Sequence, residues 1–232
     1  MNCLICEGNN DRYFFHQCLF RFSADSGYQI SNNISDFSRI FQSRHHPYFR
    51  LKYCCIIFGE GGKRKLFERV VMQFVRELFG KTKEELRFFV VIDNDGTEDE
   101  KLLDIYAKSI QNSLNLRGLN RYSCKYHKKL SCFEIYSELD NRLKCYVKVF
   151  HIPQSLESEL VKKCIVKCRY SPNIQSKLAQ MSPHNALKRI TEDKGLPLED
   201  LIRKSVNEGW FSDELWFKKI IRDISLMFSL KD

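Results

Sequence analysis

The stretch "RFFVVIDNDG" (residues 87–96) joins an apolar run to a turn that carries two aspartates. The run is rich in β-branched and aromatic residues and has no polar residue after its first arginine. It therefore predicts a short strand that is covered on both faces. Asp93 and Asp95 stand two residues apart, and on extended backbone that spacing points both side chains the same way. Gly96 then allows the chain to turn into the next element.

Outward from this stretch, strand patterns alternate with helix patterns, which predicts an α/β fold with a mainly parallel central sheet flanked by helices. The end of the chain is helical throughout, so we expect an α/β domain over residues 1–160 and a helical extension over 161–232. Residues 23–35 and the "SPN" at 171–173 are rich in turn-forming residues and predict loops. The predicted strands are 2–6, 53–58, 87–92 and 145–153, with one or two more within 121–137. The predicted helices are 10–22, 63–79, 98–115, 156–168, 182–194, 197–207 and 211–229.

The composition favours a folded protein with a polyanionic partner. Of the 232 residues, 43% are hydrophobic, which is ample for a core. The formal charge of +9 makes nucleic acid the leading candidate partner. No apolar run is long enough to cross a membrane and no secretory signal is visible, so we expect a cytoplasmic protein without a membrane partner.

The ten cysteines predict neither a zinc site nor a disulfide framework. Cys3 and Cys6 lie three apart on a predicted strand, so their side chains point to opposite faces. Cys164 and Cys168 lie one helical turn apart, with no second pair at zinc-finger spacing. We expect ordinary buried thiols, with a stabilising disulfide as the alternative if the source is a hyperthermophile.

Acidic residues directly follow three of the predicted strands. Glu7 and Asp11 follow the first, Asp93 and Asp95 the third, and Glu157 the strand that ends before Pro153. Because the carboxyl ends of parallel strands share one edge of a sheet, these carboxylates are expected to converge there. An oxygen-only set favours Mg²⁺ or Mn²⁺, which would relieve the repulsion among the carboxylates. Each group taken alone is more often a turn or a helix cap than a set of metal ligands.

The segments "LICEGNND" (4–11) and "FFVVIDNDG" (88–96) resemble the two signature motifs of the Toprim domain. That domain is shared by topoisomerases of types IA and II, bacterial primases, recombination mediators, small ribonucleases and the overcoming-lysogenization-defect (OLD) nucleases. The resemblance covers roughly residues 1–160 and implies a Rossmann-like fold. It implies that Glu7 is a general acid/base or a metal ligand, and that Asp93 and Asp95 bind Mg²⁺.

The resemblance also extends, less firmly, to further acidic positions of the OLD-type nucleases. Asp11 and Glu157 match these positions, and Glu159 competes with Glu157 for the last one. The sequence departs from several branches, since it shows no tyrosine-bearing topoisomerase domain, no ATPase domain and no zinc domain. It therefore resembles a stand-alone Toprim protein, for which a separate partner protein would supply the missing domains.

Three basic segments are candidates for contacts with a nucleic acid. "FGEGGKRK" (58–65) is either a simple turn or a loop whose backbone amides hold a phosphate. "SRHHPYFRLKY" (43–53) mixes basic and aromatic residues, and "KYHKK" (125–129) reads first as an exposed turn. The candidate nucleic-acid contacts in these segments are Lys63, Arg64, Lys65, Arg44, Lys128 and Lys129.

These features favour a Mg²⁺- or Mn²⁺-dependent enzyme that cleaves phosphodiester bonds in DNA or RNA. One alternative is a nucleic-acid-binding module that turns nothing over. A weaker alternative is nucleotidyl transfer or primer synthesis, which would need a nucleoside triphosphate site that the sequence does not show. The apolar surface of residues 211–229 is expected to pack on the sheet domain, with part of it open to a homodimer contact.

Overall fold

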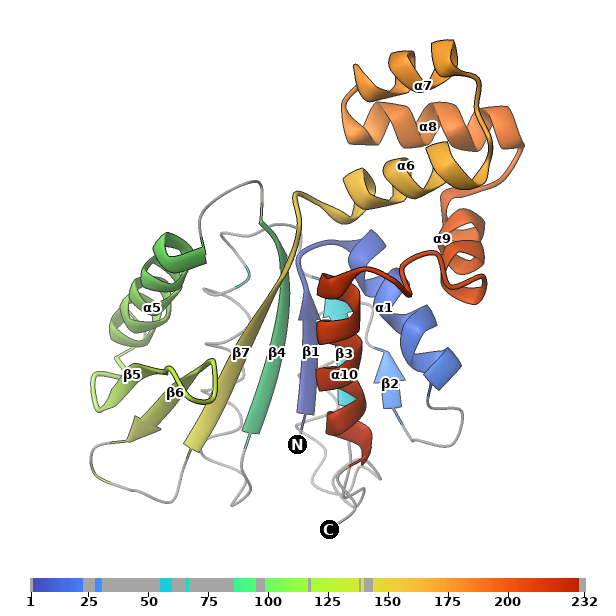
Figure 1. Cartoon of the computed structure of the whole chain (residues 1–232). Helices are drawn as coiled ribbons and strands as arrows, with labels where there is room; N and C mark the ends of the chain where they lie inside the picture. The colour runs from blue at the N-terminus through green and yellow to red at the C-terminus, as the bar shows by residue number, and fades with distance from the viewer. Residues whose placement is uncertain are drawn as a thin grey trace. The chain divides into compact units, whose positions relative to one another are not determined.

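A computed structural model of the chain confirms the α/β class. It contains both strands and helices, drawn in Figure 1. The residues that the structure describes are 2–22, 28–30, 55–59, 66, 86–94, 99–116, 118–137, 139 and 144–229.

Seven strands within the described residues form one mixed sheet. Their order across the sheet is β2-β3-β1-β4-β7-β6-β5. The neighbours from β2 through β4 pair in parallel, whereas β7, β6 and β5 pair antiparallel. The predicted parallel arrangement therefore holds for one half of the sheet, and three antiparallel strands make up the other. The strands are β1 (Asn2–Cys6), β2 (Tyr28–Ile30), β3 (Cys55–Gly59), β4 (Leu86–Asp93), β5 (Tyr122–His127), β6 (Cys132–Ser137) and β7 (Lys144–Ile152).

The helices follow the apolar periodicity of the sequence in most places. None of the helices within the described ranges is long and apolar enough to cross a membrane. The helices are α1 (Asn9–Phe22), α5 (Asp99–Leu116), α6 (Leu156–Lys167), α7 (Pro172–Ala179), α8 (Pro183–Lys194), α9 (Leu198–Asn207) and α10 (Leu215–Ser229).

Two predicted loops are wrong. Strand β2 lies within residues 23–35, and helix α7 begins inside the "SPN" segment with Pro172 in its first turn. Proline is well tolerated there because the first turn needs no backbone N–H from it. The last helix also begins later than predicted, at Leu215. The helix predicted for 63–79 lies outside the described residues, except for residue 66.

The chain divides into two compact units. The first comprises residues 1–12, 25–92 and 97–150, and the second comprises 13–24, 93–96 and 151–232. The boundary at residue 160, predicted from the sequence, stays a prediction.

The core of the first unit lies between α5 and the sheet. Tyr106, Ile110 and Leu114 recur at intervals of four residues along α5, so they share one face of the helix. This face is buried in one cluster with sheet residues such as Phe133 and Val147. The apolar stripe of α5 therefore determines which side of the helix faces the sheet.

The second unit contains an aromatic cluster. The ring of Phe14, from α1, meets Phe211 edge-on with centroids 5.3 Å apart and lies 5.9 Å from Phe217. Trp216 contacts both Phe211 and Phe217. These tilted and edge-on arrangements are the favourable ones for aromatic pairs. The cluster fixes the segment between α9 and α10 within this unit.

Strand β5 is the last strand of the sheet order, and a side chain from α5 covers its outer edge. The backbone N–H of Cys124 donates to Oε1 of Gln111 at 2.9 Å. Nε2 of Gln111 donates to the carbonyl oxygen of Tyr122 at 3.3 Å. The amide of Gln111 thus takes the place of a neighbouring strand along part of an edge that would otherwise be open to pairing.

Candidate functional site

The Glu-Gly turn after β1 is built as the beginning of α1. The backbone N–H of Gly8 donates to Oδ2 of Asp11 at 2.9 Å, and the N–H of Arg12 donates to the Gly8 carbonyl oxygen at 3.1 Å. A side chain three residues into a helix that bonds back to the preceding backbone is the reciprocal half of a capping box. A Cβ at Gly8 would lie 3.2 Å from the same Oδ2 atom, so glycine permits this close approach. Asp11 is 5% exposed and caps the helix, whatever further role it has.

Glu7 directly follows β1 and lies beside β4. Its backbone N–H donates to the carbonyl oxygen of Val91 at 3.2 Å, which extends the register that pairs Cys6 with Val91. Its side chain is half-buried. The Glu-Gly turn is therefore hydrogen-bonded to Val91, which lies two residues before Asp93 in β4.

The end of β4 lies next to the end of β7. Asp93 is the last residue of β4 and is half-buried. The next backbone N–H, from Asn94, donates to the carbonyl oxygen of Ile152 at 2.9 Å. Since Ile152 is the last residue of β7, both strands end at the same edge. Oδ1 of Asn94 is buried and has no hydrogen-bond partner within the described residues. Asp95 lies outside them.

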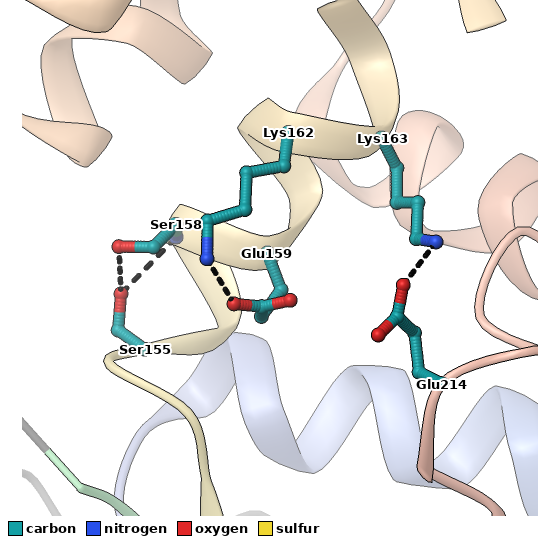
Figure 2. A network of polar contacts seen from close by, with 6 residues as sticks. All are labelled: Ser155, Ser158, Glu159, Lys162, Lys163 and Glu214. Atoms are coloured by element: carbon teal, nitrogen blue, oxygen red, sulfur yellow. Dashed lines mark hydrogen bonds and ion pairs between the residues drawn. The ribbon is translucent and has the colours of Figure 1, made fainter. Parts of the chain in front are cut away.

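Three residues separate the end of β7 from the beginning of α6, and serine side chains build the cap of this helix (Figure 2). Ser155 is the N-cap residue, and its Oγ accepts a hydrogen bond from the backbone N–H of Ser158 at 3.1 Å. The two serine hydroxyl oxygens lie 3.0 Å apart. This arrangement satisfies one of the backbone donors that a helix start leaves without a partner. It also fixes the direction of the first turn, which carries Glu157 and Glu159.

The two glutamates of this turn differ in their surroundings. Glu159 is 5% exposed, and its Oε1 lies 2.6 Å from Nζ of Lys162, as Figure 2 shows. Its charge is already balanced by that lysine. Glu157 is half-buried. The ion pair makes Glu159 the weaker candidate for the last acidic position.

The predicted acidic residues are divided between the two units. Glu7 and Asp11 belong to the first unit, and Asp93 and Glu157 belong to the second. Within the ranges that the structure describes, no three His, Cys, Asp or Glu side chains form a group that could hold a metal ion. The predicted set includes Asp95, which is not among these residues. The assignment of the metal ligands therefore stays a prediction.

Of the predicted nucleic-acid contacts, only two are among the described residues. Lys128 and Lys129 are exposed in the turn between β5 and β6, where the sequence predicted a turn. The remaining four lie outside the described residues: Arg44, Lys63, Arg64 and Lys65.

Sequence reasoning missed a pair of titratable side chains in the β5–β6 hairpin. Nε2 of His127 lies 2.7 Å from Oε2 of Glu134, which is itself buried. The hairpin register places Lys125 opposite Glu134 and His127 two pairs nearer the turn, opposite Cys132, so the contact is a diagonal one. The signal in the sequence was the alternation around "HKK", but the contact depends on a register that the alternation does not specify.

Seven cysteines carry thiols that are not joined in disulfides, and five of them are buried: Cys6, Cys18, Cys132, Cys145 and Cys164, with Cys124 and Cys168 half-buried. Burial raises the pKa of the Cys124 and Cys164 thiols to about 12. The nearby Cys168 adds to the shift at Cys164, and Lys194 and Lys204 oppose it. Both thiols therefore stay protonated at neutral pH and are poor nucleophiles.

Comparison with known proteins adds evidence about the fold alone. No protein-family model matches the chain, and no curated protein matches it. The chain is similar to the crystal structure of hypothetical protein PH0156 from Pyrococcus horikoshii OT3, with a TM-score of 0.54. The two are 12% identical, and the match covers 97% of this chain and 95% of that chain. At this identity the likeness concerns the path of the backbone and assigns no activity.

Proposed function

We propose that the protein is a Mg²⁺- or Mn²⁺-dependent nuclease built on a Toprim-like, Rossmann-like domain. The observation that carries the proposal is the parallel pairing of β1 with β4, in which Cys6 lies opposite Val91. Glu7 directly follows β1, and Asp93 ends β4. The Glu-Gly turn and Asp93 therefore lie at the ends of neighbouring strands that run in the same direction, which supports a site shared by the two motifs.

The chemistry of the donors fits a hard divalent cation. Asp93 and Asp95 would hold the cation, with Glu157 as a further carboxylate donor. Asp11 would contribute in addition to its capping bond to Gly8. An all-oxygen set of this kind favours Mg²⁺ or Mn²⁺ over zinc.

The residues of the chain then have separate tasks at the phosphodiester. A bound divalent cation supplies charge stabilisation at the phosphate and a lower pKa for the attacking water. Glu7 would either complete the ligand set or exchange a proton with that water as a general acid/base. The formal charge of +9 would favour association with the polyanionic substrate.

The test is cleavage of single- and double-stranded DNA and RNA, with Mg²⁺, with Mn²⁺ and with EDTA. The variants are Asp93→Asn and a matched control, Asp104→Asn, on the exposed side of α5. We expect Asp93→Asn to lower the cleavage rate by more than about 100-fold, because even outer-shell partners of a metal are worth 10- to 100-fold. Asp104→Asn should cleave at the wild-type rate.

Two results would refute the proposal. One is a wild-type protein that cleaves none of the four substrates with either metal. The other is an Asp93→Asn variant as active as Asp104→Asn. Salt-dependent binding without any cleavage would instead support the binding-module alternative.

A further inference from the structure

Residues 160–191 have an unusual charge pattern. They contain seven Lys and Arg residues and no Asp or Glu. The segment covers most of α6, all of α7 and most of α8. Helix α6 packs against α8, and residues 180–182 join α7 directly to α8, so the three helices form one small bundle in the second unit (Figure 1).

Two of the seven basic side chains form ion pairs with carboxylates. Lys162 pairs with Glu159, and Lys163 pairs with Glu214, as Figure 2 shows. The other five are exposed and form no ion pair with any described residue. We call these five the basic helical surface: Lys167, Arg169, Lys177, Lys188 and Arg189.

Helix α8 shows that the cations point outward. Ala186, Leu187 and Ile190 are buried, so they define the face of α8 that is packed in the bundle. Lys188 lies between these residues in sequence but on the opposite side of the helix, Arg189 lies at the flank of the buried face, and both are exposed. Their side chains are thus presented to the surroundings and not used for packing.

Arg169 occupies a backbone position that is unfavourable for arginine. It follows α6 with φ of 52°, in the left-handed region. The corresponding ends of α8 and α9 have Gly195 and Gly209, with φ of 62° and 66°. Glycine adopts this conformation without a steric penalty, whereas a side chain is disfavoured there. Arg169 therefore places an exposed guanidinium where the other two of these helix ends have glycine.

We propose that the basic helical surface binds the phosphate backbone of a double-stranded nucleic acid. Proteins that hold single strands stack the bases on aromatic side chains. The only Phe, Tyr or Trp in 160–191 is Tyr170, which is buried and donates a hydrogen bond from its hydroxyl group to Asp193. The exposed amides of Asn173 and Asn185 add donors that suit phosphate and sugar oxygens. A duplex is therefore the partner that this chemistry fits.

The inference names a substrate class for the proposed nuclease, but the binding needs no metal. Binding is therefore measured by fluorescence anisotropy with the full chain in EDTA, using a labelled 25-base-pair DNA duplex, an RNA duplex and the matching single strands. If all five cations contact phosphates, log K should fall with log salt with a slope of about −4.5. Affinity would then drop about 500-fold between 50 and 200 mM salt. Duplexes should bind more tightly than single strands.

Two adjacent pairs of cations give a matched comparison. Lys188→Gln/Arg189→Gln removes two charges from the basic helical surface, and Lys218→Gln/Lys219→Gln removes two exposed charges from α10. The first variant should reduce the slope by about 1.8, whereas the second should leave it unchanged. If the two variants reduced the salt slope equally, binding would depend on the total charge and not on the basic helical surface, and the proposal would be wrong.

Arg169→Gly distinguishes a loss of nucleic-acid binding from a loss of stability. It should raise Tm by about 2–4 °C, since it relieves the left-handed conformation, and yet reduce the salt slope by about 0.9. A variant that binds duplex as well as the wild type would refute a role for Arg169. Tighter binding of single strands, or of an acidic peptide such as polyglutamate, would overturn the choice of partner. Duplex binding without cleavage would reject only the proposed nuclease activity. Cleavage by the wild type, together with unchanged duplex binding by Lys188→Gln/Arg189→Gln, would reject only the proposed role of the basic helical surface.

Discussion

Gln111→Leu tests whether one side chain protects the outer edge of the sheet. Leucine keeps the approximate size of glutamine but leaves the N–H of Cys124 and the carbonyl of Tyr122 without the amide that bonds them. A hydrogen bond contributes about 0.5–1.5 kcal/mol net, so two of them predict a loss of about 1–3 kcal/mol in the free energy of unfolding. The two groups also become available to another chain, which predicts self-association.

The assay is urea denaturation followed by circular dichroism, together with light scattering of the native protein at increasing concentration. Asn112→Leu is the matched control, because it adds the same apolar side chain at an exposed position of the same helix. It should change the free energy of unfolding by less than about 0.5 kcal/mol. Gln111→Leu would refute the reasoning if it unfolded at the same urea concentration as Asn112→Leu and scattered no more light.

The remaining predictions concern the cap of α1 and the buried thiols. Asp11→Ala removes the carboxylate that accepts a hydrogen bond from the Gly8 N–H. In EDTA, where no metal contributes, it should lower the free energy of unfolding by about 0.5–2 kcal/mol. An unchanged urea midpoint would contradict the role of Asp11 as a helix cap. Cys124 and Cys164 ionise more readily unfolded than folded, because burial raises their folded pKa to about 12. Their contribution to stability is therefore complete below about pH 8.5 and is lost as the pH rises toward 12. Urea midpoints at pH 8 and pH 10.5 should differ less in Cys124→Ala than in the wild type, and an equal difference would contradict the assignment.

The elements that the sequence predicted are those in which burial leaves a repeating pattern. β4 reads as a strand because its apolar run is uninterrupted, and α5 reads as a helix because its apolar residues recur every three or four positions. α7 leaves no such pattern, since Leu178 is its only buried residue. β2 has three residues, which is too short for any alternation to be recognised. The two missed elements are thus a strand of three residues and a helix with a single buried side chain.

The contacts at and near the candidate site also differ in how far the sequence could predict them. The cap between Gly8 and Asp11 is local, so their spacing was sufficient to suggest it. The ion pair of Glu159 with Lys162 is also local, yet only the structure distinguishes it from a second metal ligand. The contact between His127 and Glu134 joins two strands and depends on their register. Contacts between strands were beyond the sequence because they require knowing which residues face each other.

Helix α6 separates Glu157, a residue of the proposed metal site, from Arg169, a residue of the basic helical surface. It begins at the Ser155 cap, three residues after Ile152, which is bonded to the end of β4, and it ends just before Arg169. At a rise of 1.5 Å per residue, the helix separates Ser155 from Arg169 by about 21 Å. Successive phosphates of one strand are 3.4 Å apart along a duplex, so this distance corresponds to about six base pairs. A duplex that ran along α6 from Arg169 would therefore extend about half a helical turn before it reached Glu157, in the first turn of the helix. On that path, the length of α6 would determine how many base pairs separate the phosphate bound at Arg169 from this carboxylate of the proposed site.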